Sequence, residues 1–445
     1  MNTNLITPFD IIYSIILIYI ILNFTKSIQK KNILEKSYYK YLTKGLIIKL
    51  SGGVFFCLIY LLYYGGGDTT NYFIGVKAVL NVFTDNPLNY FKLLFTSVGS
   101  DLNKFFFDVQ SYPPMYMLRD QRTMTVIKIT SLFSMLGLGG FLPTTILVST
   151  FIFSWIWKLY GFLATRYPNR IQAVNICLLY LPSTIFWGSG IMKDTFVFGA
   201  TCYTIYGLHQ FFIERKRNGK TLLTLLFSFY IILMIKAYIM FALLPGLLIF
   251  ANFERLKSIK SYFIKLIVYP ITFSLIILAA NTLFFDFNEL FGKYSADNLF
   301  EEAALQNSDL KRDVYGGNSF DIGKFDPTLQ GAISKFLPAI NAAIFRPYIW
   351  EVGSPTMLLS GIENIILLSM SIWLILTKPI KLFRSIGSDP FIIFCLLFTI
   401  ILGFGVGLST SNFGALVRYK IPFLPFFTFI ICYNLPRLKQ SISPE

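Results

Sequence analysis

The residues best able to do chemistry in this sequence are a few charged side chains at the edges of long apolar segments. Asp68 is the first of them and lies in "YYGGGDTTNYF", after one apolar run and three glycines. Three glycines allow a tight backbone turn, and a carboxylate held in a fixed position can take a proton from an attacking hydroxyl. We therefore predict that Asp68 is a general base. The alternative is a solvated carboxylate in a polar loop.

A second charged group lies in "FWGSGIMKDTF", where Lys193 and Asp194 follow a Gly-Ser-Gly sequence. One interpretation is helix capping with a local ion pair, because an acidic residue is favourable in the first turn of a helix. The other is an anion site, in which the glycines and a helix N-terminus are completed by the point charge of Lys193. Lys236, in "IKAYIMF", is expected at the same boundary of the membrane.

A third group lies in "RPYIWE", where Arg346 and Glu351 flank the aromatic residues Tyr348 and Trp350. One interpretation is a pair of aromatic residues at the membrane interface beside a salt bridge. The other is a sugar platform, in which ring faces stack on a sugar while charged groups bond its hydroxyls. Glu363, about two turns into the next apolar run, needs a partner at that depth, and a nearby Arg or Lys is expected.

Arg418 and Tyr419 open the last apolar run in "LVRYKIP". One interpretation is that the side chains of Arg418 and Lys420 snorkel, so that their charged groups reach the membrane–water interface. A guanidinium in this position can instead bind a lipid-linked phosphate through two hydrogen bonds.

Motifs for several other activities do not occur in the sequence. His209 is the sole histidine, so we interpret it as structural, and the five cysteines have no paired spacing and lie within apolar runs. The sequence contains no GxxxxGK phosphate loop and no HExxH motif, which disfavours an ATP-driven pump and a metalloprotease. No metal site is predicted, and a divalent metal cofactor is compatible with the sequence but required by none of its motifs.

The composition shows which environment must position these residues. Hydrophobic residues make up 55% of the 445 residues and charged residues only 14%, with a mean hydropathy of +0.61. A soluble globular chain has about a quarter of its residues charged. The first apolar run lacks a basic leader and a small-residue cleavage site, so we expect it to be a retained span. The chain is predicted to be an integral membrane protein.

Apolar runs of about 20 residues, the length of a membrane-spanning helix, predict an all-α fold: a polytopic helix bundle, residues 1–445, with about 11–12 transmembrane helices. A further run at residues 124–139 is short and breaks at glycines, so we interpret it as a re-entrant or interfacial helix. Two larger external loops are expected at residues 65–123, with amphipathic segments, and at residues 285–354. The eleven expected spans are residues 8–24, 46–64, 141–162, 171–189, 194–213, 221–236, 238–252, 262–284, 355–377, 390–409 and 418–435.

The charge distribution predicts the orientation of these spans. The formal net charge is +16, and the basic residues gather in the short loops of one face, for example six lysines against one glutamate in "KSIQKKNILEKSYYKYLTK". Such loops are typically cytoplasmic. The opposite loops are balanced or acidic, with ten acidic and six basic residues at positions 286–354. We expect an outer N-terminus, a cytoplasmic C-terminus, and contact with anionic membrane lipid instead of nucleic acid.

Several of these segments together resemble a known group of membrane proteins. "GGGDTTNYF" after an early span resembles the first external loop of the C-type membrane glycosyltransferase superfold, and "FWGSGIMKD", "RPYIWE" and "GALVRYKIPFLP" resemble segments of bacterial surface-polysaccharide polymerase-like proteins. The resemblance implies a bacterial inner membrane location. It implies a base role for Asp68, binding of a polyprenyl phosphate by Lys193 and Arg418, and an acceptor site at Arg346 and Glu351. In that family the acidic residue of the first external loop is often followed directly by a second one, whereas in this sequence Asp68 is followed by Thr69.

We therefore expect a glycosyltransferase or polysaccharide polymerase that uses a polyprenyl-phosphate-linked sugar donor and a glycan acceptor at the outer face. The reaction would be an inverting glycosyl transfer, in which cations stabilise the leaving phosphate and a carboxylate activates the acceptor hydroxyl. The alternative is a transporter or flippase for a lipid-linked saccharide, in which the same charges line a path. A structural membrane subunit is a third possibility.

Overall fold

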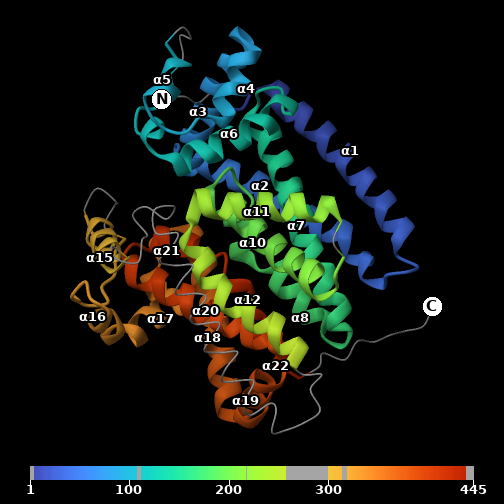
Figure 1. Ribbon diagram of the computed structural model, residues 1–445, viewed down its shortest axis with the longest axis vertical. Coiled ribbons are helices and arrows are strands. Elements are labelled where there is room, and N and C mark those ends of the chain that lie inside the picture. The colour runs from blue at the N-terminus through green and yellow to red at the C-terminus, as the bar shows by residue number, and fades with distance from the viewer. Residues whose placement is uncertain (1–4, 108–111, 217, 257–298, 313–317, 437–445) are drawn as a thin grey trace. The chain divides into compact units, whose positions relative to one another are not determined.

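The computed structural model describes residues 5–107, 112–216, 218–256, 299–312 and 318–436 (Figure 1). Within these ranges nearly all regular structure is helical, and β pairing is confined to one isolated bridge between Ser319 and Asn412. The prediction of an all-α fold is confirmed. The expected span at residues 262–284 and the start of the external loop at residues 285–354 lie outside the described residues.

The chain divides into two compact units. Unit 1 consists of Met1–Thr165, Thr184–Tyr206 and Leu223–Lys236, and unit 2 consists of Arg166–Ser183, Gly207–Leu222 and Ala237–Glu445. The helical elements within unit 1 or ending at its boundary are α1 (Pro8–Asn32), η1 (Ser37–Tyr41), α2 (Leu42–Leu58), η2 (Ile59–Tyr63), α3 (Asp68–Asp85), α4 (Pro87–Phe95), α5 (Ser100–Lys104), η3 (Met117–Arg119), α6 (Gln121–Leu136) and α7 (Phe141–Arg166).

Three further helices carry the chain from one unit to the other, and the rest belong to unit 2. The connecting helices are α9 (Pro182–Trp187), α10 (Lys193–Leu208) and α11 (Gly219–Lys236). The elements of unit 2 are η4 (Pro168–Arg170), α8 (Ile171–Asn175), η5 (Ile176–Tyr180), η6 (His209–Ile213), α12 (Tyr238–Leu256), α15 (Leu299–Asp309), α16 (Leu329–Ser334), α17 (Phe336–Phe345), η9 (Ile349–Glu351), α18 (Pro355–Thr377), α19 (Pro379–Ser388), α20 (Pro390–Ser409), α21 (Phe413–Tyr419) and α22 (Leu424–Asn434).

Six helices in the described part of the chain are long and apolar enough to cross a membrane, or seven spans if the bent pair α21 and α22 counts as one. They identify the chain as an integral membrane protein. The bounds of α18 and α20 match the expected spans at residues 355–377 and 390–409. The six are α1, the continuous segment Ser37–Tyr63, α7, α11, α18 and α20.

Two of the expected spans are interrupted, and proline is the physical reason in both cases. The span expected at residues 171–189 ends its first helical part at Tyr180, because Leu181 has ψ 115°. The α conformation is disfavoured before a proline such as Pro182. The span expected at residues 418–435 is bent by 67° between α21 and α22, where Pro422 and Pro425 remove backbone donors.

Helices α3 and α6 form the packed centre of the part of unit 1 that lies at the top of Figure 1, where α3, α4, α5 and α6 gather. Phe73 and Val76 of α3 are fully buried, and Ile127 of α6 lies against Gly75. The Tyr90 hydroxyl lies 3.0 Å from Ser131 Oγ and joins α4 to α6. The segment predicted to be a re-entrant or interfacial helix at residues 124–139 is therefore part of a packed helix pair.

Helix α4 is amphipathic, as expected for the external loop at residues 65–123. Tyr90 and Leu93 are fully buried, whereas the apolar side chains of Leu88, Phe91 and Phe95 are exposed. These exposed residues follow the helical repeat and form one apolar face. Such a face suits a helix that lies along a membrane surface.

The core of unit 2 is built around aromatic side chains of α20. Phe394 and Phe398 are fully buried and stack with ring centroids 5.8 Å apart. Phe426 of α22 packs edge-on against both, at 5.7 Å and 5.5 Å. Because lipid is as apolar as these side chains, close van der Waals packing between helices is what stabilises such a contact in a membrane.

Candidate functional site

Asp68 begins helix α3 immediately after a turn made of three glycines. Gly65, Gly66 and Gly67 have φ values of 66°, 136° and 145°, a region that side chains disfavour and glycine adopts freely. The turn closes through a hydrogen bond of 2.9 Å from the Gly67 N–H to Thr70 Oγ1. The predicted glycine turn is confirmed. It places Asp68, which is half-buried, in the first turn of a helix whose N-terminus favours negative charge.

Tyr116 is the neighbour that the structure brings to Asp68. Burial of the Tyr116 hydroxyl and the nearby charge of Asp68 both raise the pKa of this tyrosine, and a hydrogen bond with Asn71 lowers it. Tyr116 belongs to the same segment between the apolar spans but is 48 residues further along the chain. The loop therefore folds back on α3 and encloses the first turn of that helix from one side.

Lys193 forms an ion pair with Asp120, a residue that the sequence analysis did not select. Lys193 Nζ lies 2.8 Å from Asp120 Oδ2, and the two side chains are 21% and 38% exposed. Asp120 also caps α6, because it accepts hydrogen bonds from the backbone N–H groups of Arg122 and Thr123 at 3.2 and 3.3 Å. The position of Asp120 directly before an apolar helix was the sequence signal for a cap, but nothing in the sequence indicated Lys193 as its partner.

The Asp120 carboxylate remains ionised throughout the physiological pH range. Burial raises its pKa, but the charge of Lys193 and hydrogen bonds from Lys193, Thr123 and Arg122 outweigh burial and lower the pKa to about 2. Burial lowers the pKa of the Lys193 ammonium, and the charge of Asp120 opposes this shift. Since both side chains are partly exposed, Lys193 can exchange its carboxylate partner for another anion without crossing a packed core.

Asp194 pairs with Lys236, not with its chain neighbour Lys193. Lys236 Nζ lies 2.5 Å from Asp194 Oδ1, and the two side chains are only 7% and 4% exposed. The local ion pair between Lys193 and Asp194, one of the two interpretations from the sequence, is thus wrong. The buried pair joins α10 to the end of α11, which gives Asp194 and Lys236 a structural role within unit 1.

The "GSG" sequence before Lys193 packs tightly against helix α2. A β-carbon at Gly190 would lie 2.1 Å from the ring of Phe56, and one at Gly52 would lie 2.3 Å from the carbonyl oxygen of Ile185. Ser149 Oγ donates to the Ser189 carbonyl at 2.5 Å. Close helix packing therefore explains these glycines, and the packed hairpin fixes the start of α10, where Lys193 lies.

Lys49 is a second functional candidate that the sequence analysis missed. It is 5% exposed, and its ammonium group donates to the Gly188 carbonyl and lies 5.8 Å from the centroid of the Phe198 ring. No carboxylate pairs with it among the residues the structure describes. A lone lysine inside the apolar run "LIIKLSGGVFF" was a visible sequence signal, because a charge at such a position needs a specific partner.

Asp68 and Lys193 both lie next to the short segment at residues 116–122 of unit 1. Tyr116 lies beside Asp68, and Asp120, four residues later, holds Lys193. In addition, Lys193 Nζ lies 5.9 Å from the centroid of the Tyr72 ring, one turn after Asp68 on α3. Unit 1 thus places the half-buried carboxylate of Asp68 and the ammonium group of Lys193 along the start of α3 and the segment at residues 116–122.

In unit 2, Arg346 and Glu351 form a doubly hydrogen-bonded pair. Arg346 Nε lies 3.0 Å and 3.1 Å from the two carboxylate oxygens of Glu351, and the second of these oxygens also accepts the Tyr348 N–H at 2.9 Å. The guanidinium also lies over the rings of Phe320 and Phe413, at 4.7 and 5.4 Å. These contacts occupy the charged groups of the pair.

Trp350 is the residue of this group that faces away from the protein. Its side chain is 73% exposed, and its ring stacks on Tyr348 at 4.9 Å with an interplanar angle of 22°. The geometry suits both interpretations from the sequence, because an exposed ring pair can stack on a sugar or lie at a membrane interface.

Glu363 is buried in α18 and forms no salt bridge within the described residues. Its Oε2 accepts the Ser183 N–H at 2.8 Å, while its Oε1 has no hydrogen-bond partner in that part of the chain. The expected cation is Lys420, whose charge acts on Glu363 through space. Lys420 Nζ itself bonds to Asn364 Oδ1 at 2.5 Å and to the Arg346 carbonyl at 3.3 Å.

Arg418 and Tyr419 lie in the last turn of α21, and both are partly buried. Arg418 Nε donates to the Gly414 carbonyl of its own helix at 3.1 Å. The other selected residues belong to unit 2, whereas Asp68, Lys193, Asp194 and Lys236 belong to unit 1.

In the described ranges, no group of three or more His, Cys, Asp and Glu side chains gathers closely enough to hold a metal ion. His209 stacks on Phe250 at 5.7 Å and lies 3.4 Å from Glu214, which fits its expected structural role. No protein-family model, curated protein or solved structure shows significant similarity to this chain.

Proposed function

We propose that this integral membrane protein is a glycosyltransferase or a polysaccharide polymerase that uses a polyprenyl-phosphate-linked sugar donor. The observation that carries the proposal is the presence, along one stretch of unit 1, of the half-buried Asp68 and of Lys193, whose ion pair with Asp120 is partly exposed. The charge distribution of the loops supports a location of this site at the outer face of a bacterial inner membrane, with the N-terminus outside and the C-terminus inside.

In the proposed reaction Asp68 acts on the acceptor. Its carboxylate takes the proton of the acceptor hydroxyl as the oxygen of that hydroxyl bonds to the anomeric carbon of the donor sugar. The bond between the anomeric carbon and the phosphate oxygen breaks, and the electron pair leaves with the lipid phosphate. Attack opposite to the leaving group inverts the anomeric configuration.

Lys193 acts on the leaving group. An ammonium positioned beside the phosphate stabilises the charge that develops on its oxygen, which lowers the barrier to departure. Binding of the phosphate replaces Asp120 as the partner of Lys193.

The experiment that tests the proposal compares Asp68→Asn with the wild type and with Asp85→Asn. Asp85 is the exposed last residue of the same helix, so its substitution controls for a lost charge on α3. Each purified protein receives a polyprenyl-linked sugar donor pool and membrane glycan acceptor. We expect Asp68→Asn to form product at least about 100-fold more slowly, the lower end of general-base effects, with donor binding unchanged. Unaltered product formation would rule out the base role.

A second candidate function is transport of a lipid-linked saccharide across the bilayer. The observation that favours it is the 67° bend between α21 and α22, because discontinuous helices are frequent in transporters. The same preparation in sealed vesicles separates the two functions. Saccharide that crosses the bilayer without product formation by the wild type would favour transport.

A further inference from the structure

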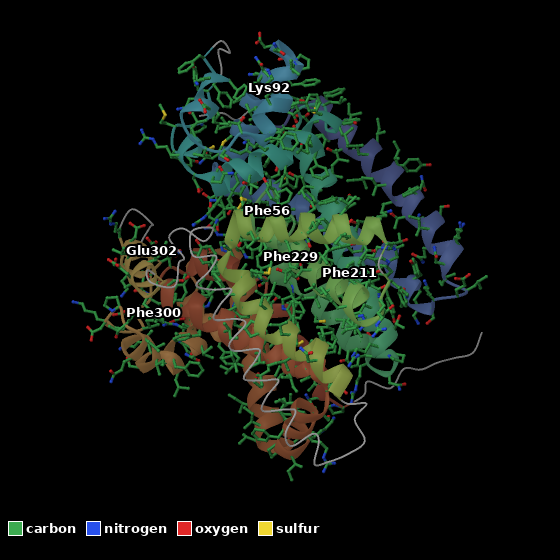
Figure 2. All side chains as sticks on the ribbon, in the orientation of Figure 1. Phe56, Lys92, Phe211, Phe229, Phe300 and Glu302 are labelled. Atoms are coloured by element: carbon green, nitrogen blue, oxygen red, sulfur yellow. The ribbon has the colours of Figure 1, made fainter. Side chains whose placement is uncertain are left out.

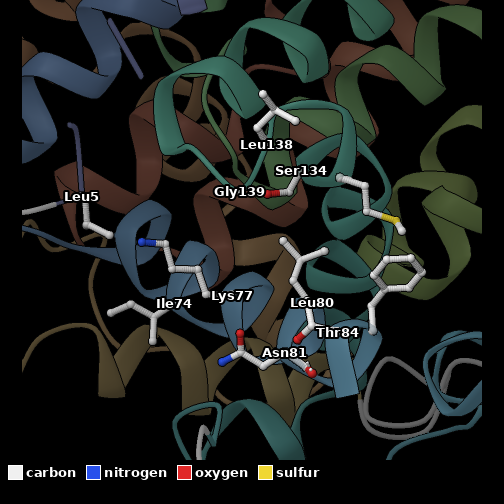
Figure 3. Close-up of a pocket in the computed structure, with 11 residues that line it drawn as sticks. Leu5, Ile74, Lys77, Leu80, Asn81, Thr84, Ser134, Leu138 and Gly139 are labelled. Atoms are coloured by element: carbon white, nitrogen blue, oxygen red, sulfur yellow. Dashed lines mark hydrogen bonds between the residues drawn. The ribbon is translucent and has the colours of Figure 1, made fainter. Parts of the chain in front are cut away.

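A pocket of about 740 Å³ lies within unit 1 and contains none of the residues discussed above as a site (Figure 3). Its wall is formed by one face of α3, the last turn of α6, the turn that follows α6, and Leu5. The volume is within the range of about 300–1,000 Å³ found for small-molecule sites. Most of the lining is apolar and includes Leu80, Met135 and Leu138.

The polar side of this pocket is a stripe on α3 made of Lys77, Asn81 and Thr84. These residues follow a spacing of four and then three, which places them on one helix face. The opposite face of α3, with Val79 and Val82, is buried. The stripe is therefore a row of hydrogen-bonding groups on α3, whose other face packs against the rest of unit 1.

The ammonium group of Lys77 has no anionic partner in the described part of the chain. It lies over the ring of Phe73, whose centroid is 5.5 Å from Nζ. An ammonium that faces a concave, largely apolar surface attracts a negatively charged group. The apolar remainder of the wall favours a ligand that continues into hydrocarbon.

The pocket lies at the end of a membrane span. Leu5 comes just before α1, and the Tyr13 hydroxyl of α1 donates to the Leu136 carbonyl at the end of α6, at 2.9 Å. The α1 side chains of Phe9 and Ile12 are 57% and 60% exposed, as expected for a helix that faces lipid. We therefore expect the pocket to lie where headgroups meet hydrocarbon.

From these observations we propose that the pocket binds a membrane lipid through its phosphate group. Lys77 contacts the phosphate oxygens, Asn81 and Thr84 bond to neighbouring oxygens of the headgroup, and Leu80 and Leu138 contact the hydrocarbon. The lipid is either an anionic phospholipid of the bilayer or a polyprenyl phosphate. The site goes beyond the proposed glycosyl transfer and does not depend on it, since it contains neither Asp68 nor Lys193.

The test uses the full chain, purified in detergent, and measures binding by native mass spectrometry. The probes are dioctanoyl phosphatidylglycerol, farnesyl phosphate and inorganic phosphate. Lys77→Met removes the charge and retains an apolar stem, while Lys77→Arg retains the charge. Lys92→Met is the matched control, because Lys92 is an exposed lysine on neighbouring α4 and lies outside the pocket (Figure 2).

We expect Lys77→Met to weaken binding of at least one lipid phosphate about tenfold, because the variant loses a hydrogen bond between charged groups. Lys77→Arg should retain most of the affinity and Lys92→Met all of it, and inorganic phosphate should bind at least about tenfold more weakly. The tighter of the two lipids identifies the source. Lipid binding that Lys77→Met leaves unchanged, or inorganic phosphate that binds as tightly as the lipids, would overturn the proposal. This experiment measures lipid binding and not glycosyl transfer. A negative result would therefore overturn the lipid site without bearing on the proposed role of Asp68.

Discussion

At the scale of single residues, unit 1 holds two lysine–aspartate pairs of different burial. The side chains of Lys193 and Asp120 are 21% and 38% exposed, whereas those of Lys236 and Asp194 are 7% and 4% exposed. A buried charge is tolerated only with a partner, and removal of one partner leaves the other uncompensated. The two pairs therefore suit different tasks: the first can exchange its partner, and the second holds α10 against α11.

The buried pair gives a prediction for stability. Lys236→Met should lower the free energy of unfolding by about 3–5 kcal/mol, because it leaves the Asp194 carboxylate buried without a counter-charge. Equilibrium unfolding in mixed detergent measures this loss. The double variant Asp194→Leu with Lys236→Met should regain most of the stability, because no buried charge remains.

A matched control for this prediction is Lys104→Met, which removes one partner of an exposed pair with side chains 69% and 73% exposed. Its unfolding midpoint should match that of the wild type, since exposed pairs contribute little. If Lys236→Met unfolded like this control, Asp194 and Lys236 would not form a buried pair.

At the scale of elements, the hairpin before α10 depends on glycines where it meets α2. A β-carbon at Gly52 would lie 2.3 Å from the carbonyl oxygen of Ile185, so any larger residue must displace the hairpin. Lys49, one turn earlier on α2, donates to the Gly188 carbonyl of the same hairpin. The position of Lys193 is therefore set by the contact between this hairpin and α2.

We predict that Gly52→Ala lowers the free energy of unfolding by about 1–3 kcal/mol, the usual cost of overpacking. We also expect weaker binding of the sugar donor, because Lys193 shifts with the hairpin. Unfolding measurements and donor titration test the two effects. Gly405→Ala is the control, because Gly405 also lies within a helix but has no atom within 4 Å of a β-carbon. A Gly52→Ala variant as stable as Gly405→Ala would show that the hairpin does not pack this closely.

At the scale of the whole molecule, the charge of the loops and the apolar spans together predict one orientation in the membrane. The basic residues gather in loops that are predicted to share one side. The segment at residues 65–123, which is predicted to be external, carries five acidic and five basic residues. Positively charged loops remain on the cytoplasmic side during insertion. The proposed site at Asp68 should therefore face outward.

Cysteine labelling in intact cells tests this orientation. The five native cysteines are all buried, so they should react little with a membrane-impermeant maleimide. Asp101→Cys replaces a residue with a 73% exposed side chain in the loop predicted to be external. Lys216→Cys replaces a residue with a 66% exposed side chain in a basic loop. We expect label at position 101 in intact cells and at position 216 only after permeabilisation. The opposite pattern would reverse the orientation and place Asp68 inside.

The sequence alone determined the class of the protein and many of its helices. Apolar runs of spanning length can only be helical in a bilayer, because every backbone polar group must be bonded within the segment. Local signals then set the bounds: Ser354 caps α18 and Asp389 caps α20, each followed by a proline at the helix start. Both helices begin and end where the sequence predicted. The glycine turn before Asp68 was also predictable, because it depends on three adjacent residues.

Only the tertiary structure decided which charges meet. Lys193 was expected to pair with Asp194 or with a ligand, yet its partner Asp120 is 73 residues away, and Asp194 bonds to Lys236, 42 residues away. Glu363 was expected to pair directly with a cation, yet it bonds to the Ser183 N–H. Such pairings depend on which helix faces pack together. A helix presents each side chain to a neighbour that the local sequence does not specify, so the spacing of charges along one chain cannot determine their partners.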